Sequence, residues 1–201
     1  MAKRTTNRGR QAAATRQKIY RCGVHLMNRC GYENITVAQI AKKANVSIGT
    51  FYHYFPSKFS LLVEVYRLGD VFFTERVPAL LEQYAACADR IVEYFCLYAQ
   101  LSIHDGIEMV RSLYVPTNEM FISHGRAMQG MLTEILRQGQ ERGELTDSVP
   151  AELLTERLFV VARGVIFDWC LHNGEIDLLA EMREILSRQA QSYFTPPQKN
   201  A

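Results

Sequence analysis

The sequence predicts an all-α protein. Apolar residues recur three or four positions apart in almost every segment, and the alternation typical of strands is scarce. Hydrophobic residues make up 48% of the 201 residues and charged residues 22%, so the chain can bury a core and is neither disordered nor fibrous. The length allows one domain or one domain with a small appendage. No apolar run approaches the roughly 18 residues of a membrane span, so we expect no membrane partner.

The first predicted helix covers about residues 12–30. Gly31 follows it, at the position where a left-handed residue ends many helices. The spacing of the apolar residues predicts an inward face that is made of Ile19, Cys22, Leu26 and Cys30.

The second and third helices have clear start and stop signals. Thr36 and Gln39 form a capping box, in which each side chain binds a free backbone N–H at the start of the second helix. Asn45 tolerates the left-handed turn that follows. Ser47 caps a third helix, residues 48–55, which ends before Pro56. The residues of these helices that are expected in the core are Ile40, Ala41, Ala44, Phe51 and Phe55.

The rest of the chain predicts further helices. Ser57 caps the fourth one, a long helix covers about residues 150–173, and a last helix covers about 176–193. Residues 195–201 are expected to be disordered. The helices in between are expected to break at Pro78, Asp105-Gly106, Pro116 and Gly143.

Charge is distributed unevenly along the chain, although the net charge is only +2. Residues 1–58 hold eleven lysines and arginines and one acid, Glu33, whereas the remainder holds twelve lysines and arginines and twenty acids. A dense basic segment attracts polyanions, and an acidic remainder does not. A solvated basic tail would explain residues 3–10 alone, but the excess continues into helix-forming sequence. We therefore expect a nucleic acid as a partner.

Two helices joined by a tight turn, the second one short and polar on one side, make a helix-turn-helix. The run from Gly31 to Lys58 resembles the DNA-binding domain of the TetR family of transcriptional regulators. The likeness covers about 45 N-terminal residues. It rests on the small-residue turn, the Gly-Thr-Phe-Tyr-x-Tyr-Phe segment at 49–55 and the closing Ser57-Lys58. One departure is Gly23, where the family more often carries Ala, and this glycine should weaken the first helix by roughly 0.5–1 kcal/mol.

The resemblance implies about nine helices, a homodimer and two functional parts. Residues 1–58 would form an N-terminal arm and the DNA-binding domain, and residues 59–194 would form a helical ligand-binding and dimerisation domain. The partners implied are a palindromic double-stranded DNA operator and an apolar or aromatic small-molecule inducer. No cofactor and no metal are expected, and the protein is expected to work in the cytoplasm.

The resemblance places the third helix in the major groove of DNA, which admits one helix. Thr36 is a candidate for a phosphate contact as well as a helix cap. Arg8 and Arg10 either reach a minor groove or make no contact. Lys58 is expected to bind a phosphate beside the free N–H groups of the fourth helix. The candidate base contacts are Ser47, Ile48, Gly49, Thr50 and His53, and the remaining candidate phosphate contacts are Tyr52 and Tyr54.

Aromatic residues and methionines gather between residues 84 and 131. At helical spacing such residues usually form the core. A ligand pocket is the alternative, because a few polar residues are mixed in among many apolar ones, as in small-molecule sites. The candidate pocket residues are Tyr94, Tyr98, Met109, Tyr114, Asn118, Phe121, His124, Met128 and Trp169.

The predicted helix at 150–173 is apolar on nearly every side, so it must be covered on every side. The core of so small a chain can cover only part of it, which indicates a partner subunit, and the TetR family forms a four-helix bundle from the last two helices of each subunit. Gly164 would permit close approach of helices. The candidate interface residues are Leu154, Leu158, Val161, Gly164, Val165, Met182 and Ile185.

The leading hypothesis is a transcriptional repressor that a small inducer releases from its operator. A DNA-binding protein controlled by a protein partner is one alternative. An all-helical enzyme is another, although the sequence holds no Gly-rich phosphate loop and no nucleophile motif. His104 and Glu108 are spaced as either two metal ligands or a surface pair, and the sequence offers no third ligand. Five cysteines without a C-x-x-C pair predict reduced, mostly buried thiols.

Overall fold

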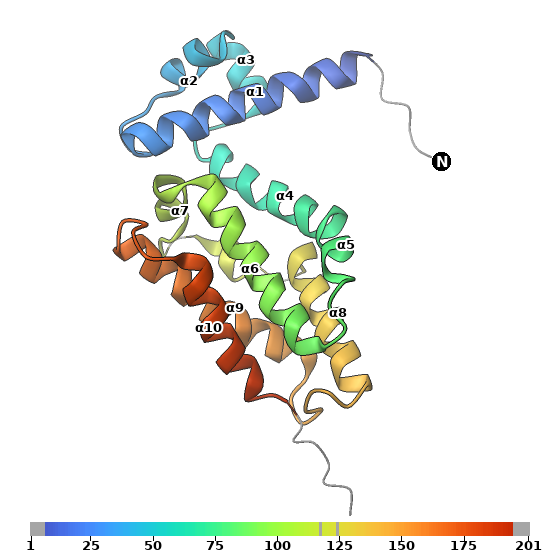
Figure 1. Cartoon of the computed structure of the whole chain (residues 1–201). Helices are drawn as coiled ribbons and strands as arrows, with labels where there is room; N and C mark the ends of the chain where they lie inside the picture. Colours follow the sequence, from blue (N-terminus) through green and yellow to red (C-terminus); the bar gives the residue numbers. More distant parts are fainter. Residues whose placement is uncertain (1–6, 117, 124, 195–201) are drawn as a thin grey trace, which may run out of the picture. The chain divides into compact units, whose positions relative to one another are not determined.

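A computed structural model describes residues 7–116, 118–123 and 125–194 of the chain. These residues form ten α-helices, one short 3-10 helix and no strand beyond a single isolated bridge between Leu145 and Phe194 (Figure 1). The predicted all-α fold is confirmed. The segment expected to be disordered, residues 195–201, lies outside the described residues.

The helices group into two compact units. The first holds the chain up to Arg67 together with residues 105–115, and the second holds residues 68–104 and the chain from Pro116 onward. Helix α4 (Ser60–Glu75) contributes to both units, because Arg67 lies in its middle. The first unit is therefore larger than the predicted 1–58 segment and is discontinuous in sequence.

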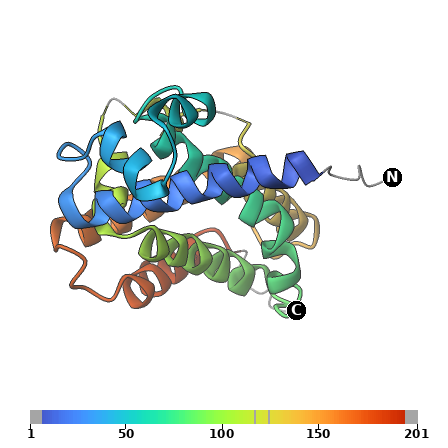
Figure 2. The same ribbon diagram turned by 90° about the horizontal axis from the view of Figure 1, so that it is seen from above.

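The first unit is built on α1 (Asn7–Cys30), the long helix beside α2 (Val37–Ala44) and α3 (Ile48–Tyr54) in Figure 2. Helix α1 begins five residues earlier than predicted, so Arg8 and Arg10 are helical. Its buried residues also differ from the predicted face: Cys30 is exposed, and Cys22 and Leu26 are only half-buried. Helix α1 carries two apolar stripes at helical spacing, and the partners of the fold select the other one. The buried residues are Ile19, Tyr20, Gly23 and Met27.

Helix α7 (Ile107–Leu113) joins the first unit through its contact with α1. The Asn28 side chain donates to the backbone carbonyl of Asp105 at 2.6 Å and accepts from the backbone N–H of Met109 at 3.1 Å. Gly106 lies between these bonds with φ of 89°, and a Cβ there would collide with the Asn28 amide. The predicted break at Asp105-Gly106 is thus confirmed, and only glycine fits it.

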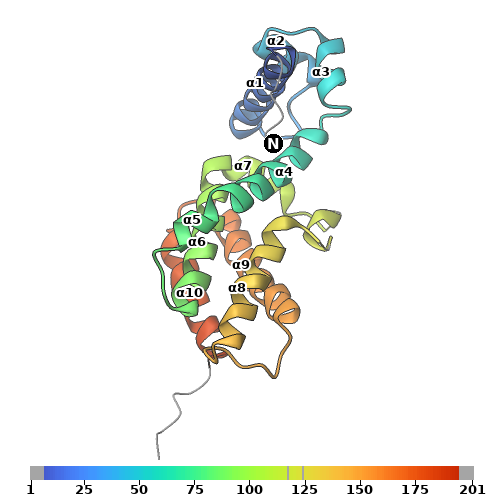
Figure 3. The ribbon, with the colours of Figure 1, turned by 90° about the vertical axis from the view of Figure 1, so that its right-hand side faces the viewer.

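In the second unit, α9 packs between α8 and α10 (Figure 3). Gly143 and Gly174 have positive φ at the ends of α8 and of the turn after α9, which confirms the predicted break at Gly143. Pro78 lies in the first turn of α5 instead of ending a helix, because proline there loses no hydrogen bond. The helices of this unit outside α4 are α5 (Val77–Leu81), α6 (Cys87–Asp105), η1 (Glu119–Phe121), α8 (Ala127–Glu141), α9 (Ala151–Leu171) and α10 (Leu178–Gln191).

An aromatic cluster fills the core of the second unit. The rings of Phe73 and Tyr94 lie 4.6 Å apart between centroids, and Phe159 lies 5.3 Å from Phe95 and 5.7 Å from Tyr98. Most of these pairs meet edge to face, the arrangement that aromatic rings prefer. Across residues 7–116, 118–123 and 125–194, no helix combines the length and hydropathy that crossing a membrane requires.

Candidate functional site

The turn between α2 and α3 is fixed by the caps that the sequence predicted. The Thr36 hydroxyl accepts from the backbone N–H of Gln39 at 3.2 Å, and the Gln39 side chain accepts from the backbone N–H of Thr36 at 2.7 Å. Asn45 follows α2 with φ of 52°, in the left-handed region. The Ser47 hydroxyl accepts from the backbone N–H of Thr50 at 3.0 Å and caps α3. Local side-chain chemistry thus sets where both helices begin.

Helix α3 has a buried side and an exposed side. Phe51 is completely buried, as is Phe55 directly after the helix, which confirms both as core residues. Ile48 and Tyr52, four residues apart, are 50% and 49% exposed. Large apolar side chains with this exposure on a short helix are unusual unless something binds there. The other candidate contacts on this side are Ser47, Gly49 and His53, which are exposed, and Thr50 and Tyr54, which are half-buried.

Lys58 has partners within the first unit. Its ammonium group donates to the backbone carbonyls of Tyr32 at 2.8 Å and Ile35 at 3.1 Å, and it lies 4.2 Å from the centroid of the Tyr32 ring. An ammonium group has three N–H donors, so these carbonyls take two of them. Lys58 therefore fastens the loop before α2, and one donor remains for the predicted phosphate contact.

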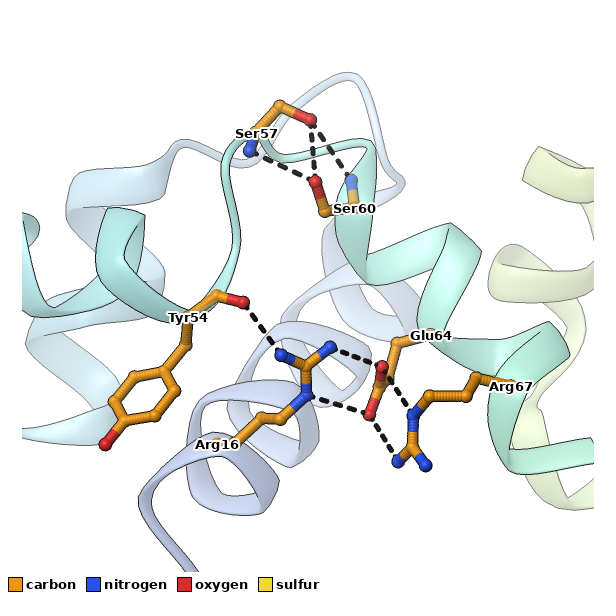
Figure 4. A network of polar contacts seen from close by, with 6 residues as sticks. All are labelled: Arg16, Tyr54, Ser57, Ser60, Glu64 and Arg67. Atoms are coloured by element: carbon orange, nitrogen blue, oxygen red, sulfur yellow. Dashed lines mark hydrogen bonds and ion pairs between the residues drawn. The ribbon is translucent and has the colours of Figure 1, made fainter. Parts of the chain in front are cut away.

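Arg16 connects three helices of the first unit (Figure 4). Its guanidinium donates to the Tyr54 carbonyl at the end of α3 at 3.0 Å and to both oxygens of Glu64 on α4 at 3.2 and 2.7 Å. It also lies over the Phe55 ring, 4.7 Å from the centroid. This connection is not apparent from the sequence, because Arg16 and Glu64 lie 48 residues apart. It holds the C-terminal end of α3 against α1 and α4.

A second arginine completes the same cluster. Arg67 donates to the two oxygens of Glu64 at 3.0 and 2.7 Å. Burial alone would raise the pKa of the Glu64 carboxyl, but the hydrogen bonds from Arg16 and Arg67 outweigh burial and lower this pKa below its ordinary value. Glu64 is therefore a buried, charged anchor at the start of α4. One turn earlier, Ser57 and Ser60 exchange hydrogen bonds that cap α4, as predicted for Ser57 (Figure 4).

A cavity of about 680 Å³ lies between α8 and α9. The segment before α8 forms one wall, and the Thr133 and Thr155 hydroxyls bond to each other at 2.9 Å across the two helices. The lining residues are Phe121, Ile122, Ser123, Gly125, Gln129, Gly130, Thr133, Arg137, Glu152, Thr155, Glu156, Phe159, Val160 and Arg163.

The candidate pocket residues do not gather at this cavity, apart from Phe121. Tyr94 and Met128 are core residues, and the Tyr94 hydroxyl donates to the Met128 carbonyl at 2.7 Å. Met109 and Tyr114 belong to the first unit, and Trp169 packs against the turn at Gly174. His124 lies outside the described residues. Of the remaining candidates, Asn118 is buried and caps η1, and Tyr98 is half-buried beside Phe159.

The candidate interface residues also divide between two sides of the helices. Leu154, Leu158, Val165 and Met182 are buried in the core of the single chain, so they are not available to a partner. Helix α9 is apolar on nearly every side, and its periodicity did not reveal which side the chain itself covers. Val161 is half-buried, whereas Gly164 and Ile185 are exposed. The other large apolar residues exposed on α9 are Leu153, Val160, Phe167 and Leu171.

The remaining candidates for chemistry have ordinary surroundings. Glu108 pairs with Arg111 at 2.7 Å, and no group of three His, Cys, Asp or Glu residues gathers among the described residues. Cys87, Cys96 and Cys170 are buried, as expected, but Cys30 is exposed. Burial and the nearby Glu144 carboxylate raise the pKa of the Cys87 thiol to about 11, so this thiol stays protonated near neutral pH.

Residues 19–65 match the family described as bacterial regulatory proteins, tetR family. The matched range contains the whole turn between α2 and α3, both candidate DNA-contacting segments and the Glu64 anchor. Helix α7, although part of the first unit, lies outside it.

Two curated relatives are similar to this chain. The fatty acid metabolism regulator protein of Bacillus subtilis is 25% identical over 179 residues, which cover 84% of this chain and 90% of the relative. The HTH-type transcriptional repressor KstR of Mycolicibacterium smegmatis is 39% identical over 64 residues, or 32% of this chain and 29% of the relative. The first likeness thus extends over both units, and the second covers about one third of the chain.

Solved structures share the fold. The transcriptional regulator FadR of Bacillus subtilis, in complex with stearoyl-CoA, has a TM-score of 0.74 at 20% identity and covers 87% of this chain and 97% of its own. FadR of Thermus thermophilus, a repressor in complex with lauroyl-CoA, has a TM-score of 0.68 at 23% identity and covers 92% and 98%. Both matches extend well beyond the N-terminal helices, so the helical second unit is part of the shared fold.

Proposed function

Since this chain belongs to the tetR family of bacterial regulatory proteins, we propose that it is a DNA-binding transcriptional repressor whose α3 contacts operator bases. The observation that carries the proposal is the exposed side of α3. This side is presented by a capped turn, backed by two buried phenylalanines and held at its end by Arg16. The segment up to Lys58 also carries a large excess of positive charge, which DNA phosphates attract.

The residues of α3 divide into two proposed roles. Ser47, Ile48, Gly49, Thr50 and His53 lie at the N-terminal end or on the exposed side of the helix and are proposed to contact base edges. Tyr52, Tyr54, Thr36 and Lys58 are proposed to contact phosphates. Phosphate contacts position a protein on DNA, whereas base contacts specify the sequence. A bacterial operator lies in the cytoplasm, so the regulator is proposed to act there.

We further propose that the repressor is a homodimer that uses the exposed side of α9. Leu153, Val160, Gly164, Phe167 and Leu171 are spaced seven, four, three and four residues apart, the spacing of a stripe along one side of a helix. A stripe of this kind is a candidate subunit contact. Two subunits related by a two-fold axis would present two α3 helices to an inverted repeat.

The proposed inducer is a fatty acyl thioester of CoA. The support is similarity: two related regulators of the same fold were solved with stearoyl-CoA and lauroyl-CoA, and a curated relative regulates fatty acid metabolism. An acyl chain is also an apolar ligand, the class that the sequence indicated.

The test is selection of bound fragments from random DNA by the full-length protein, followed by binding titrations at several salt concentrations. We expect enrichment of an inverted repeat. Thr50→Ala should change the preferred sequence, whereas Lys58→Ala should weaken binding to all sequences and reduce the salt slope by about 0.9 for each phosphate that the protein no longer neutralises. Enrichment of no palindrome would contradict the proposal. Operator binding that no acyl-CoA affects would favour control by a protein partner.

A further inference from the structure

The cavity between α8 and α9 has apolar walls. Phe121 and Phe159 line it, together with Ile122 and Val160, which are 73% and 60% exposed. Its volume of about 680 Å³ lies within the range of roughly 300–1,000 Å³ that is typical of small-molecule sites. Thr133 and Thr155 add hydroxyl groups at its side. A ligand that fits these walls must be largely apolar.

Arg163 gives this cavity a positive charge. Its guanidinium donates to the Phe121 carbonyl at 3.1 Å and lies 5.7 Å from the centroid of the Phe121 ring. Among residues 7–116, 118–123 and 125–194, no Asp or Glu forms an ion pair with Arg163. Arg137 at the same cavity differs, because Glu134 and Glu152 bind its guanidinium at 2.7 and 2.9 Å. Arg163 is thus the residue that would bind an anionic group.

Phe159 connects the cavity to the aromatic cluster of the core. Its side chain lines the cavity, and its ring also lies within 5.3–6.2 Å of the rings of Phe95, Tyr98 and Tyr94. Rotation of the Phe159 ring would extend the cavity toward this cluster. An apolar chain too long for the cavity therefore has a route inward that is lined by aromatic rings.

We propose that this cavity binds a ligand that joins a long apolar chain to an anionic group, with the chain against Phe121, Phe159 and Val160 and the anionic group on Arg163. The inference rests on the proposed function, because it locates the inducer of that regulator. Fatty acyl-CoA and free fatty acids share the required chemistry. The ligand would compete with the Phe121 carbonyl for Arg163 and thereby loosen the segment before α8.

The first test measures ligand affinity by calorimetry with palmitoyl-CoA, palmitate and CoA without an acyl chain. Lengthening the chain of an acyl-CoA series should tighten binding about fourfold per methylene until the cavity is full. Arg163→Gln should weaken palmitoyl-CoA about tenfold or more, because a hydrogen-bonded charge pair is lost. Arg188→Gln removes an exposed arginine of α10 outside the cavity and should have no effect. Binding of palmitate as tight as that of palmitoyl-CoA would identify the carboxylate as the anion, and binding of the thioester alone would identify CoA.

The second test fills the cavity. A Cβ at Gly130 meets no atom within 4 Å, so larger side chains fit there without displacing the backbone. Gly130→Ala should raise the melting temperature, since alanine favours a helix more than glycine does, and should leave palmitoyl-CoA binding unchanged. Gly130→Leu should also keep the protein stable but weaken the ligand at least tenfold. Damage to the fold would lower both quantities, so it would not be mistaken for blocked binding.

The outcomes separate this inference from the function on which it rests. If palmitoyl-CoA releases operator DNA equally from the wild type, Arg163→Gln and Gly130→Leu, the ligand binds elsewhere and the inference is wrong, while the proposed repressor stands. If the wild type binds operator but neither palmitoyl-CoA nor palmitate, the inference and the proposed inducer are both wrong. If the wild type binds no operator, the proposed function fails whatever the cavity binds.

Discussion

Replacing Arg16 with methionine tests whether the recognition helix is positioned from behind. Arg16→Met keeps the length of the side chain but removes the hydrogen bonds to Glu64 and to the Tyr54 carbonyl at the end of α3. Arg67→Met is the matched control. It also removes two hydrogen bonds to Glu64, but Arg67 makes no bond to α3. Comparing the two variants isolates the effect of the bond to Tyr54.

The structure gives the expected size of each effect. Hydrogen bonds to charged groups contribute about 1.5–3 kcal/mol. The Arg16 and Arg67 side chains are 39% and 54% exposed, and either arginine still neutralises Glu64 after the other is removed. Solvent screening therefore lowers the expected loss in the free energy of unfolding to about 1–2 kcal/mol for each variant. The loss of the bond to Tyr54, a neutral acceptor, should further weaken operator binding about two- to tenfold in Arg16→Met only.

The assays are urea unfolding for stability and fluorescence anisotropy for operator affinity, the latter at several salt concentrations. Arg16→Met should weaken operator binding with an unchanged salt slope, because a positioning residue neutralises no phosphate. A slope reduced by about 0.9 per subunit would show that Arg16 binds DNA directly and would refute the reasoning. Equal operator affinities for the two variants would also refute it.

Three further predictions concern other parts of the chain. Glu64→Gln should flatten the acid dependence of stability: the folded-state pKa of Glu64 is lowered, so its contribution is complete above the ordinary pKa of 4.5 and is lost as the pH falls below it, which melting curves from pH 7 to pH 3 would reveal. Phe167→Glu should yield monomers with unchanged helical content, because a charge at the centre of a subunit contact is costly, and unchanged sedimentation would contradict the proposed interface. Asp70 on α4 pairs with Arg126 at 3.3 Å and accepts from the backbone N–H of Met128 at 3.2 Å, at the start of α8. Asp70→Asn retains the second bond and weakens the first, so it should leave operator and ligand affinities nearly unchanged while reducing the coupling between them; an unchanged ratio of ligand affinities with and without operator would contradict this role.

The DNA-binding helices were predictable because their limits depend on short-range chemistry. Thr36, Asn45 and Ser47 satisfy backbone groups within three or four residues of themselves, so the sequence contains the whole interaction. The burial of Phe51 and Phe55 follows from the same short stretch. Similarity to a known family then supplied the expected role of α3, which the caps alone do not specify.

The ligand cavity was not predictable in the same way. Aromatic residues such as Tyr94 suit a pocket wall and a core equally, and only the packing of distant helices decides between the two. The cavity instead lies where Gly130 and Thr133 of α8 face Thr155 of α9, small residues that leave space between the helices. Their helices are adjacent in the fold, but nothing local to either one indicates that they face each other. The same limit affected α9, whose apolar periodicity is compatible with several buried sides.

The discontinuity of the first unit has a consequence for building hybrid regulators from this chain. A graft that transplants only the N-terminal helices would leave Asn28 without the Asp105 carbonyl and the Met109 N–H, both supplied by a segment about 80 residues later in the chain. A graft cut at residue 58 would also separate Arg16 from Glu64. An exchange of DNA specificity between relatives should therefore place one junction within α4, after Arg67, and a further pair of junctions around residues 105–115.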